Sequence, residues 1–210
     1  SNNRVPVSAS ICLGVPNLSP FEMTGGYTIF ANAGTYTEPV FIDRIEDKNG
    51  NPIYLAGEDQ DSEPILSEQS AYVMNSMLQR IQHGRLKGVK CAYGGKTGTT
   101  NYQADGWFMG ITPDLVIGTW VGCDDRFIRF RSLANGQGAK MARPIFQNIL
   151  LNMQADTTLR DDHVFSPMSK FPVPNEINRE MDCLKFDQFM GQKLRDEGND
   201  ATNTKVYENE

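Results

Sequence analysis

The sequence is poor in the residues that build metal and redox sites. It contains two histidines and four cysteines among 210 residues. The cysteines lie far apart and form no Cys-x-x-Cys pair, at Cys12, Cys91, Cys123 and Cys183. Zinc sites and dithiol motifs need such ligands at close spacing. We therefore expect no metal and no cofactor, and we interpret the cysteines as buried thiols, or as one disulfide pair in an oxidising compartment.

Basic residues and long apolar runs are also scarce. Lys and Arg number 20 against 26 Asp and Glu, which gives a formal net charge of -6. Because phosphate binding needs a basic face, this balance argues against nucleic acid as a partner. No apolar run approaches the roughly 20 residues of a membrane helix, so we expect a soluble chain, which leaves room for an anchor or export signal upstream of Ser1.

What is present is an ordinary globular composition, with 39% hydrophobic and 22% charged residues, which favours one domain.

Three helices are expected. The first starts at Ser19-Pro20, where Glu22 completes a capping box, and Gly34 ends it. The second starts near Ser67 with an apolar stripe, interpreted as core, that consists of Met74, Met77, Leu78 and Ile81. The third opens at Arg143-Pro144, with a buried face of Ile145, Phe146, Ile149, Leu150 and Met153.

Two hairpins are expected between the helices. Residues 40–45 and 51–55 flank an Asp47-Lys48-Asn49-Gly50 turn and predict a small exposed hairpin. Residues 107–111 and 115–121 flank Thr112-Pro113-Asp114 and predict a hairpin in the core. Beyond Asp156 the pattern weakens, and residues 193–210 are charged and Asn-rich, which favours a mobile tail.

The motif that carries chemistry is Gly94-Gly95-Lys96-Thr97-Gly98-Thr99-Thr100. A phosphate-binding loop is excluded because Lys90 stands where its first glycine should be. As a strand, Lys96, Gly98 and Thr100 point to one side while Thr97 and Thr99 point to the other, and Gly98 leaves the backbone accessible. Such an edge can bind an extended peptide, with the lysine suited to a terminal carboxylate. The alternative is a polar edge strand with solubilising side chains.

Together with the segments on both sides of it, this motif resembles the sequence of the class A penicillin-binding proteins, the bifunctional enzymes that polymerise and cross-link peptidoglycan. The resemblance runs in order along most of the chain. It is carried by Ala9 to Gly14, Leu18 to Met23, Tyr27 to Gly34, Ala71 to Met74, Gly95 to Asn101, Asp105 to Gly110, Thr112 to Val116, Trp120 to Gly122 and Ala142 to Phe146.

The resemblance implies an α+β fold, part of the penicillin-binding protein and serine β-lactamase type, with an antiparallel sheet flanked by helices. Residues 1–154 would form the C-terminal portion of the transpeptidase domain, and 155–210 a C-terminal extension. Lys96 would bind the carboxylate of a stem peptide or β-lactam and tune a serine hydroxyl, assisted by the Thr97 and Thr99 hydroxyls. The Thr99 N–H would form half of an oxyanion hole, and the substrate-binding strand would consist of Lys96, Thr97, Gly98, Thr99 and Thr100.

The resemblance also shows what the chain lacks. Acyl transfer in this family uses a Ser-x-x-Lys nucleophile motif, and the sequence contains none. Ser1-Asn2-Asn3 matches the second family motif, Ser-x-Asn, but stands too close to Leu13-Gly14, and Tyr207-Glu208-Asn209 follows the strand instead of preceding it. We interpret both matches as coincidental and expect a fragment, inactive alone, of a D,D-transpeptidase whose glycosyltransferase domain and membrane anchor lie upstream.

Two alternatives remain open at this point. One is a non-catalytic module of the cell envelope that binds peptidoglycan or β-lactams reversibly; the other is a structural domain in which the Lys96 strand only packs. By resemblance, the parent protein would work at the extracytoplasmic face of a bacterial inner membrane. Because a partial domain leaves apolar surface uncovered, self-association is expected.

Overall fold

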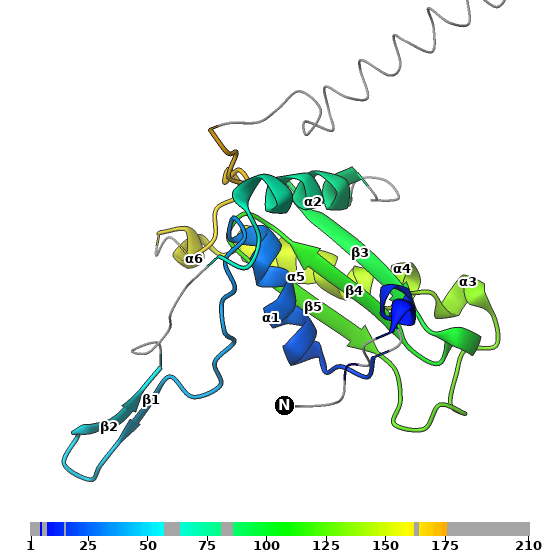
Figure 1. Cartoon of the computed structure of the whole chain (residues 1–210), viewed down its shortest axis with the longest axis horizontal. Helices are drawn as coiled ribbons and strands as arrows, with labels where there is room; N and C mark the ends of the chain where they lie inside the picture. Colours follow the sequence, from blue (N-terminus) through cyan, green and yellow to red (C-terminus); the bar gives the residue numbers. More distant parts are fainter. Residues whose placement is uncertain are drawn as a thin grey trace, which may run out of the picture.

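The computed structural model describes residues 5, 8–14, 16–56, 64–80, 86–161 and 164–175. Its centre is a three-stranded antiparallel sheet in the order β3-β4-β5 (Figure 1). The strands are β1 (Arg44–Glu46), β2 (Pro52–Leu55), β3 (Gly94–Thr99), β4 (Gly106–Ile111) and β5 (Val116–Val121). The helices are η1 (Ala9–Leu13), α1 (Pro20–Ala31), α2 (Glu68–Arg80), η2 (Asn101–Gln103), α3 (Leu133–Gly136), α4 (Gly138–Met141), α5 (Arg143–Ala155) and α6 (Thr157–Asp161).

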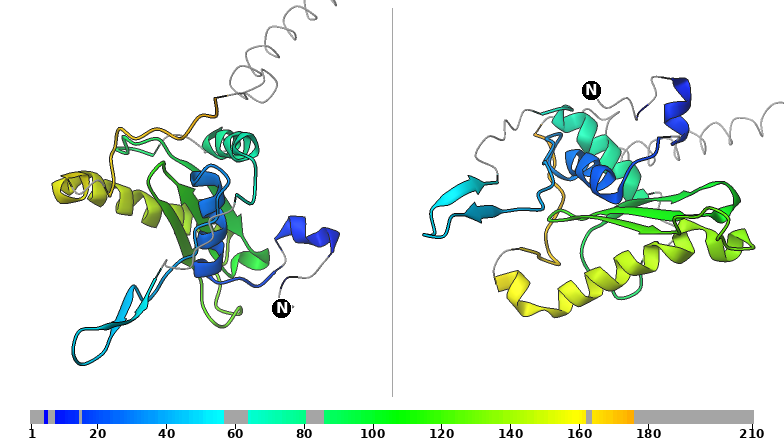
Figure 2. Two further views of the ribbon diagram at one scale, coloured as in Figure 1. Left: turned by 60° about the vertical axis from the view of Figure 1, so that its left-hand side comes forward. Right: turned by 90° about the horizontal axis from the view of Figure 1, so that it is seen from below.

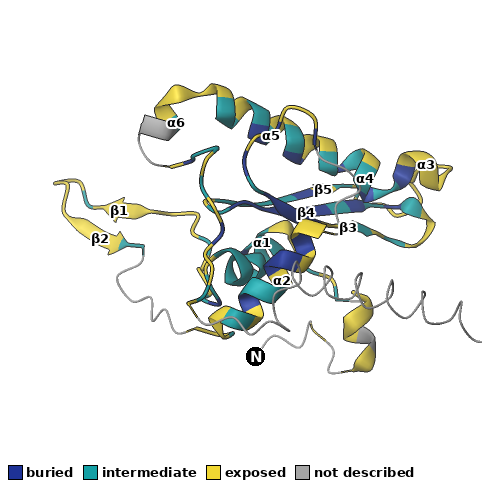
Figure 3. Cartoon of the chain, turned by 90° about the horizontal axis from the view of Figure 1, so that it is seen from above, coloured by how far each residue is buried: buried dark blue, intermediate teal, exposed yellow. Residues whose placement is uncertain are grey.

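The sheet lies between two layers of helices. Helices α1 and α2 cover one face, and α4 and α5 cover the other (Figure 3). On the first face α1 contacts β4 and β5 while α2 contacts β3. Helices on both faces of an antiparallel sheet confirm the expected α+β fold.

The expected core hairpin is confirmed as β4 and β5, which pair from Gly106 with Val121 to Ile111 with Val116. Thr112 closes the turn in two ways. Its backbone N–H donates to the Leu115 carbonyl at 2.8 Å, and its hydroxyl accepts from the Leu115 N–H at 2.9 Å. Strand β4 lies between its two neighbours and is almost wholly buried, so it is the central element of the fold.

The first helix begins as its sequence predicts. The Ser19 hydroxyl accepts from the Glu22 N–H at 3.2 Å, and the Glu22 carboxylate accepts from the Ser19 N–H at 2.8 Å, which completes the capping box. Gly34 has a left-handed φ of 98°, and its N–H donates to the Ile29 carbonyl at 2.8 Å. A Cβ atom there would lie 2.1 Å from the Leu66 carbonyl oxygen, so this chain reversal requires glycine.

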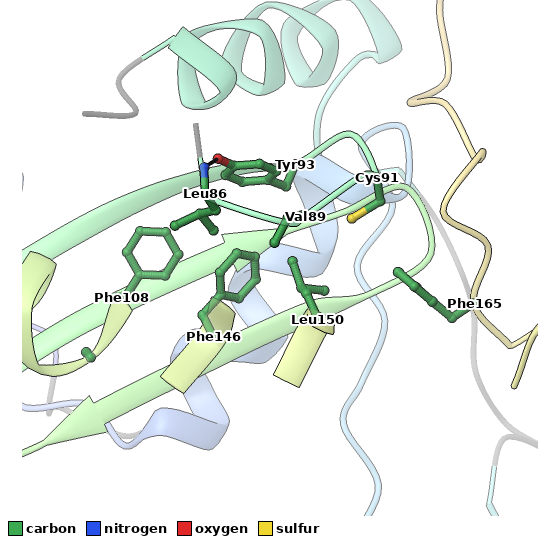
Figure 4. Packing of buried hydrophobic residues seen from close by; sticks show 9 residues of the cluster. Leu86, Val89, Cys91, Tyr93, Phe108, Phe146, Leu150 and Phe165 are labelled. Atoms are coloured by element: carbon green, nitrogen blue, oxygen red, sulfur yellow. Dashed lines mark hydrogen bonds between the residues drawn. The ribbon is translucent and has the colours of Figure 1, made fainter. Parts of the chain in front are cut away.

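The main core forms where α5 packs on β4 and on the segment before β3 (Figure 4). Phe146 is 0% exposed, and its ring lies 5.0 Å from that of Phe108 and 6.1 Å from that of Tyr93. Tyr93 in turn accepts a hydrogen bond from the Leu86 N–H at 2.6 Å through its hydroxyl. The cluster consists of Leu86, Val89, Cys91, Tyr93, Phe108, Ala142, Phe146, Leu150 and Phe165.

Three of the expected core residues are exposed instead. Met74 and Met77 lie on the open side of α2, whose buried face consists of Ala71, Asn75, Ser76 and Leu78. Ile145 is 42% exposed although Phe146 beside it is fully buried. In both helices apolar residues spread around more than half of the circumference, so periodicity alone did not select the contacting side. Ile81 lies outside the described residues.

The cysteines differ from one another. Cys91 is buried, as expected, and its burial raises the pKa of the thiol. Cys12 is exposed, so the expectation of a buried thiol is wrong there, because η1 lies outside the core clusters and its described side chains face solvent. Cys123 is half-buried, and Cys183 lies outside the described residues. No described cysteine is disulfide-bonded to another described one.

The outlying segments differ in how they contact the core. The expected exposed hairpin is confirmed but short, since β1 starts at Arg44, and it projects away from the sheet (Figure 2). The segment after α5 forms α6 and then returns to the core, where Phe165 and Phe171 are buried in two different clusters. The acidic, turn-rich stretch at 56–64 predicts a surface loop. Its residues 57–63, and the tail at 193–210 that we expect to be mobile, lie outside the described residues.

Candidate functional site

Strand β3 is the outer strand of the sheet. It pairs with β4 along its whole length, from Gly94 with Ile111 to Thr99 with Gly106. Among the described residues no strand lies on its other side, so one row of backbone groups faces outward. An open edge of this kind can accept a further extended chain by strand addition.

The side chains of β3 alternate between the two faces of the sheet. A Cβ atom at Gly94 would lie 3.1 Å from the Leu78 and Gln79 backbone, on the α2 side. A Cβ atom at Gly95 would lie 2.5 Å from the Phe108 ring, on the α5 side. By this alternation Lys96 and Gly98 face the layer of α1 and α2, whereas Thr97 and Thr99 face the layer of α4 and α5.

The backbone alternation places the Thr99 N–H on the open edge. Thr100 donates its backbone N–H to the Asp105 carbonyl at 3.2 Å, toward β4. Because successive residues of a paired strand point their N–H and C=O groups to opposite sides, those of Thr99 and Thr97 point away from β4. The Lys96 ammonium donates to the Thr97 carbonyl at 2.7 Å and therefore lies along the same edge.

The hydroxyls of the two threonines at the end of the strand have different partners. Thr99 is exposed, and its Oγ1 accepts from the Gly138 N–H at 3.0 Å, at the start of α4. Thr100 is half-buried, and its Oγ1 accepts from the Asp105 N–H at 3.1 Å and donates to the Asp105 carbonyl at 3.3 Å. The Thr100 hydroxyl thus closes the loop, whereas that of Thr99 remains accessible.

The loop that follows β3 has an unusual backbone. Tyr102 and Gln103 in η2 have φ values of 63° and 59°, in the left-handed region that few residues other than glycine adopt. The Arg129 guanidinium lies 4.9 Å from the centre of the exposed Tyr102 ring. Backbone strain of this size concentrates at binding sites, and here it lies directly beside Thr99 and Thr100.

The charge at this site comes from Lys96. Lys96 is exposed and forms no ion pair with any residue that the structure describes. The ammonium and the outward N–H groups are hydrogen-bond donors of the kind that can bind an anion. Nothing in the described ranges groups three metal-ligating side chains, and no helix there is long and apolar enough to cross a bilayer.

The structure thus places the Lys96 ammonium and the Thr99 N–H on the open edge of β3, and the Thr99 hydroxyl beside Gly138 on the face that α4 and α5 cover. Sequence reasoning missed Gly138, which lies 39 positions beyond Thr99 in the chain. No local pattern marks it, because Gly136-Gln137-Gly138 is an ordinary loop sequence. A hollow lined by Phe30, Tyr72 and Pro172 lies between α1, α2 and the segment after α6, and no β3 residue lines it.

Comparisons with known proteins identify the family of the chain. A family model described as the penicillin binding protein transpeptidase domain matches residues 6–151. Penicillin-binding protein 1A of Aquifex aeolicus is 34% identical over 142 residues, which cover 65% of this chain and 19% of that protein. The chain spans about a fifth of the length of the curated relatives that it matches.

Solved structures show the same fold. Penicillin-binding protein 1A from Haemophilus influenzae matches with a TM-score of 0.64 and 25% identity, over 83% of this chain and 31% of that one. PonA1 from Mycobacterium tuberculosis, solved in complex with penicillin V, matches with a TM-score of 0.64 and 22% identity, over 82% and 45%. The chain therefore belongs to the penicillin-binding protein transpeptidase family, and its relatives are the class A penicillin-binding proteins.

Proposed function

We propose that this chain supplies one wall of the active site of a peptidoglycan D,D-transpeptidase, an enzyme that cross-links stem peptides by acyl transfer and is acylated by penicillins. The observation that carries the proposal is the open edge of β3, where the Lys96 ammonium and the outward Thr99 N–H lie on one strand. Membership of the family supports it, as does the penicillin V complex of PonA1.

The substrate would add to the edge of β3 as a further antiparallel strand. Lys96 would bind the terminal carboxylate, because a charge-assisted hydrogen bond is about twice as strong as a neutral one. The Thr97 and Thr99 hydroxyls would assist, Gly98 would let the peptide approach closely, and Thr100 would hold the end of the strand. Binding requires Lys96 to leave the Thr97 carbonyl, which then becomes available to the added chain.

The Thr99 N–H would stabilise the negative charge that develops on the attacked carbonyl oxygen. A donor fixed in a strand needs no reorganisation during the reaction, and removing one such donor typically costs about 10²–10³ in rate. The serine, its lysine and the second oxyanion donor would come from outside this chain, whose sequence has no Ser-x-x-Lys. We place the parent enzyme, with a membrane anchor and a glycosyltransferase, at the extracytoplasmic face of the bacterial inner membrane.

Within the chain we assign residues 1–154 to the transpeptidase domain and 155–210 to a C-terminal extension. The burial of Phe165 and Phe171 supports an extension that starts by covering the core. Phe171 packs in a cluster with Ala92, so the described part of the extension lies near the start of β3.

Covalent labelling with a fluorescent penicillin tests the proposal. The complete gene product should be labelled, and this chain alone should remain unlabelled. Lys96→Ala in the complete protein should slow labelling at least tenfold, because the carboxylate loses its charged partner. Lys87→Ala is the matched control, since Lys87 is also an exposed lysine but lies outside β3, and it should label at the unchanged rate.

Two results would count against the proposal. Equal labelling rates for Lys96→Ala and Lys87→Ala would remove the role of the strand. Reversible penicillin binding to the complete protein, without covalent labelling, would instead favour a binding module of the cell envelope. That alternative rests on the same observation that the sequence has no Ser-x-x-Lys.

A further inference from the structure

The start of α4 approaches the β3–β4 pair more closely than any side chain would allow. A Cβ atom at Gly138 would lie 2.3 Å from the Trp107 carbonyl oxygen and 2.4 Å from that of Gly98. Both oxygens belong to paired strands, so they cannot move aside without disrupting the sheet. Only glycine can therefore occupy this position at the observed separation.

This approach brings the Gly138 N–H to 3.0 Å from Thr99 Oγ1. A threonine hydroxyl has one proton to donate and two lone pairs that accept. With one lone pair occupied by the Gly138 N–H, the proton is left to donate to an external acceptor. Thr99 is exposed at the end of β3, beside the edge where the proposed substrate would bind. The external acceptor would therefore be a ligand oxygen with lone pairs, such as a carboxylate oxygen.

The position of Gly138 is fixed by the core and not by a free loop. A Cβ atom at Gly106 on β4 would lie 3.0 Å from the Gly138 Cα and 2.4 Å from the Met141 Cε. Ala142 follows at 0% exposure, and its carbonyl accepts from the Thr119 hydroxyl at 3.1 Å. Helix α4 is thereby held against β4 at its start and against β5 directly after its end.

We propose that Gly138 is a positioning residue, which orients the Thr99 hydroxyl as a donor and so makes the site selective for ligands with a free carboxylate. The proposal rests on the proposed function. It adds a residue that touches no substrate and acts only through Thr99.

A comparison of two β-lactams tests this selectivity. In the complete gene product, the acylation rate constant is measured for a penicillin and for its carboxylate methyl ester. The ratio of the two should fall about tenfold in Gly138→Ala and equally in Thr99→Val, because each removes the oriented donor. The ratio should fall no further when both substitutions are combined. Thr99→Ser, which keeps a hydroxyl at this position, should have the ratio of the unchanged protein.

Gly136→Ala is the matched control. A Cβ atom there would lie 2.5 Å from the Gln103 Cβ and 2.9 Å from the Phe130 Cβ, so the substitution crowds side chains near η2 without reaching the β3 backbone. It should lower stability and leave the carboxylate-to-ester ratio unchanged. A folded Gly138→Ala protein with an unchanged ratio overturns the proposal, as does an equal loss of the ratio in Gly136→Ala.

Amide hydrogen exchange decides the matter if Gly138→Ala does not fold. In this chain labelled with ¹⁵N, the Gly138 amide should exchange slowly, and Thr99→Val should speed its exchange at least tenfold. Equally fast exchange of the Gly138 amide in the unchanged chain and in Thr99→Val overturns the proposal. Absence of penicillin acylation in the unchanged gene product would instead reject the proposed function, while the exchange measurement would still test the contact between Gly138 and Thr99.

Discussion

Phe146 packs α5 directly against the central strand β4. It is fully buried, and a Cβ atom at Gly110 would lie 2.2 Å from its ring, so the ring rests directly on the β4 backbone. Phe146→Ala should lower the free energy of unfolding by about 3–5 kcal/mol through lost burial and a new cavity. Chemical denaturation monitored by circular dichroism measures this loss.

Ile145→Ala is the matched control for that substitution. Ile145 is the preceding residue of the same helix and is 42% exposed. Because its side chain is far less buried, its loss should be clearly smaller than that of Phe146. Equal losses for the two variants would contradict the packing described for α5.

At the residue scale, the sequence alone predicted the interactions between residues that are close together in the chain. Ser19 and Glu22 are three positions apart, so their capping box could be predicted from the local pattern. The alternation of Lys96 and Thr99 follows from strand geometry in the same way. The hydrogen bond between Gly138 and Thr99 could not be predicted, because it joins segments 39 positions apart that meet only when α4 packs on the sheet.

At the element scale, the turn between β1 and β2 depends on one carboxylate. Hydrogen bonds from the side chain and backbone of Asn51 and from the Asn49 N–H hold the pKa of Asp47 below its ordinary value. A depressed folded-state pKa means that the stabilisation is present above the unfolded-state pKa and is lost as the pH falls through the folded-state pKa.

An NMR titration measures this dependence. The Asn49 and Asn51 amide signals should shift with a midpoint below about 3.9, the ordinary aspartate value. Asp47→Asn should abolish that titration, because the ionisable group is gone. A midpoint at or above the ordinary value would show that the turn does not bind the carboxylate as described.

The elements themselves were largely predictable, and their contacting faces were less so. Turn and capping residues marked α1, the β4–β5 hairpin and the start of α5. The exposure of Met74 and Met77 could not be read from periodicity, because the orientation of α2 is set by its packing against β3 and α1. Segments in contact, and not sequence spacing, decide which side of a helix is buried.

At the scale of the whole molecule, large apolar side chains remain at the surface. Phe127 is 90% exposed and Ile128 63%, in the loop between β5 and α3. Because this apolar surface and the open edge of β3 are both uncovered, the isolated chain should self-associate. Sedimentation velocity should show a mass that rises with concentration, and Phe127→Ser should weaken the association. A strictly monomeric chain at all concentrations would contradict this expectation.

The family could be identified from the sequence because its motifs occur in order from Ala9 to Phe146, and the fold agrees with them. The roles of single residues in the site stay predictions, because only a bound substrate or inhibitor shows which atoms of β3 contact it. The geometry adds that the Thr99 N–H and the Lys96 ammonium lie on the open side of β3.

The structure of the complete gene product acylated by a penicillin tests this account most directly. The carbonyl oxygen of the acyl ester should lie about 2.7–3.1 Å from the Thr99 nitrogen, with the ligand carboxylate beside Lys96 and the Thr99 hydroxyl. An acyl group whose carbonyl oxygen points away from the open edge of β3, with Lys96 still on the Thr97 carbonyl, would contradict it.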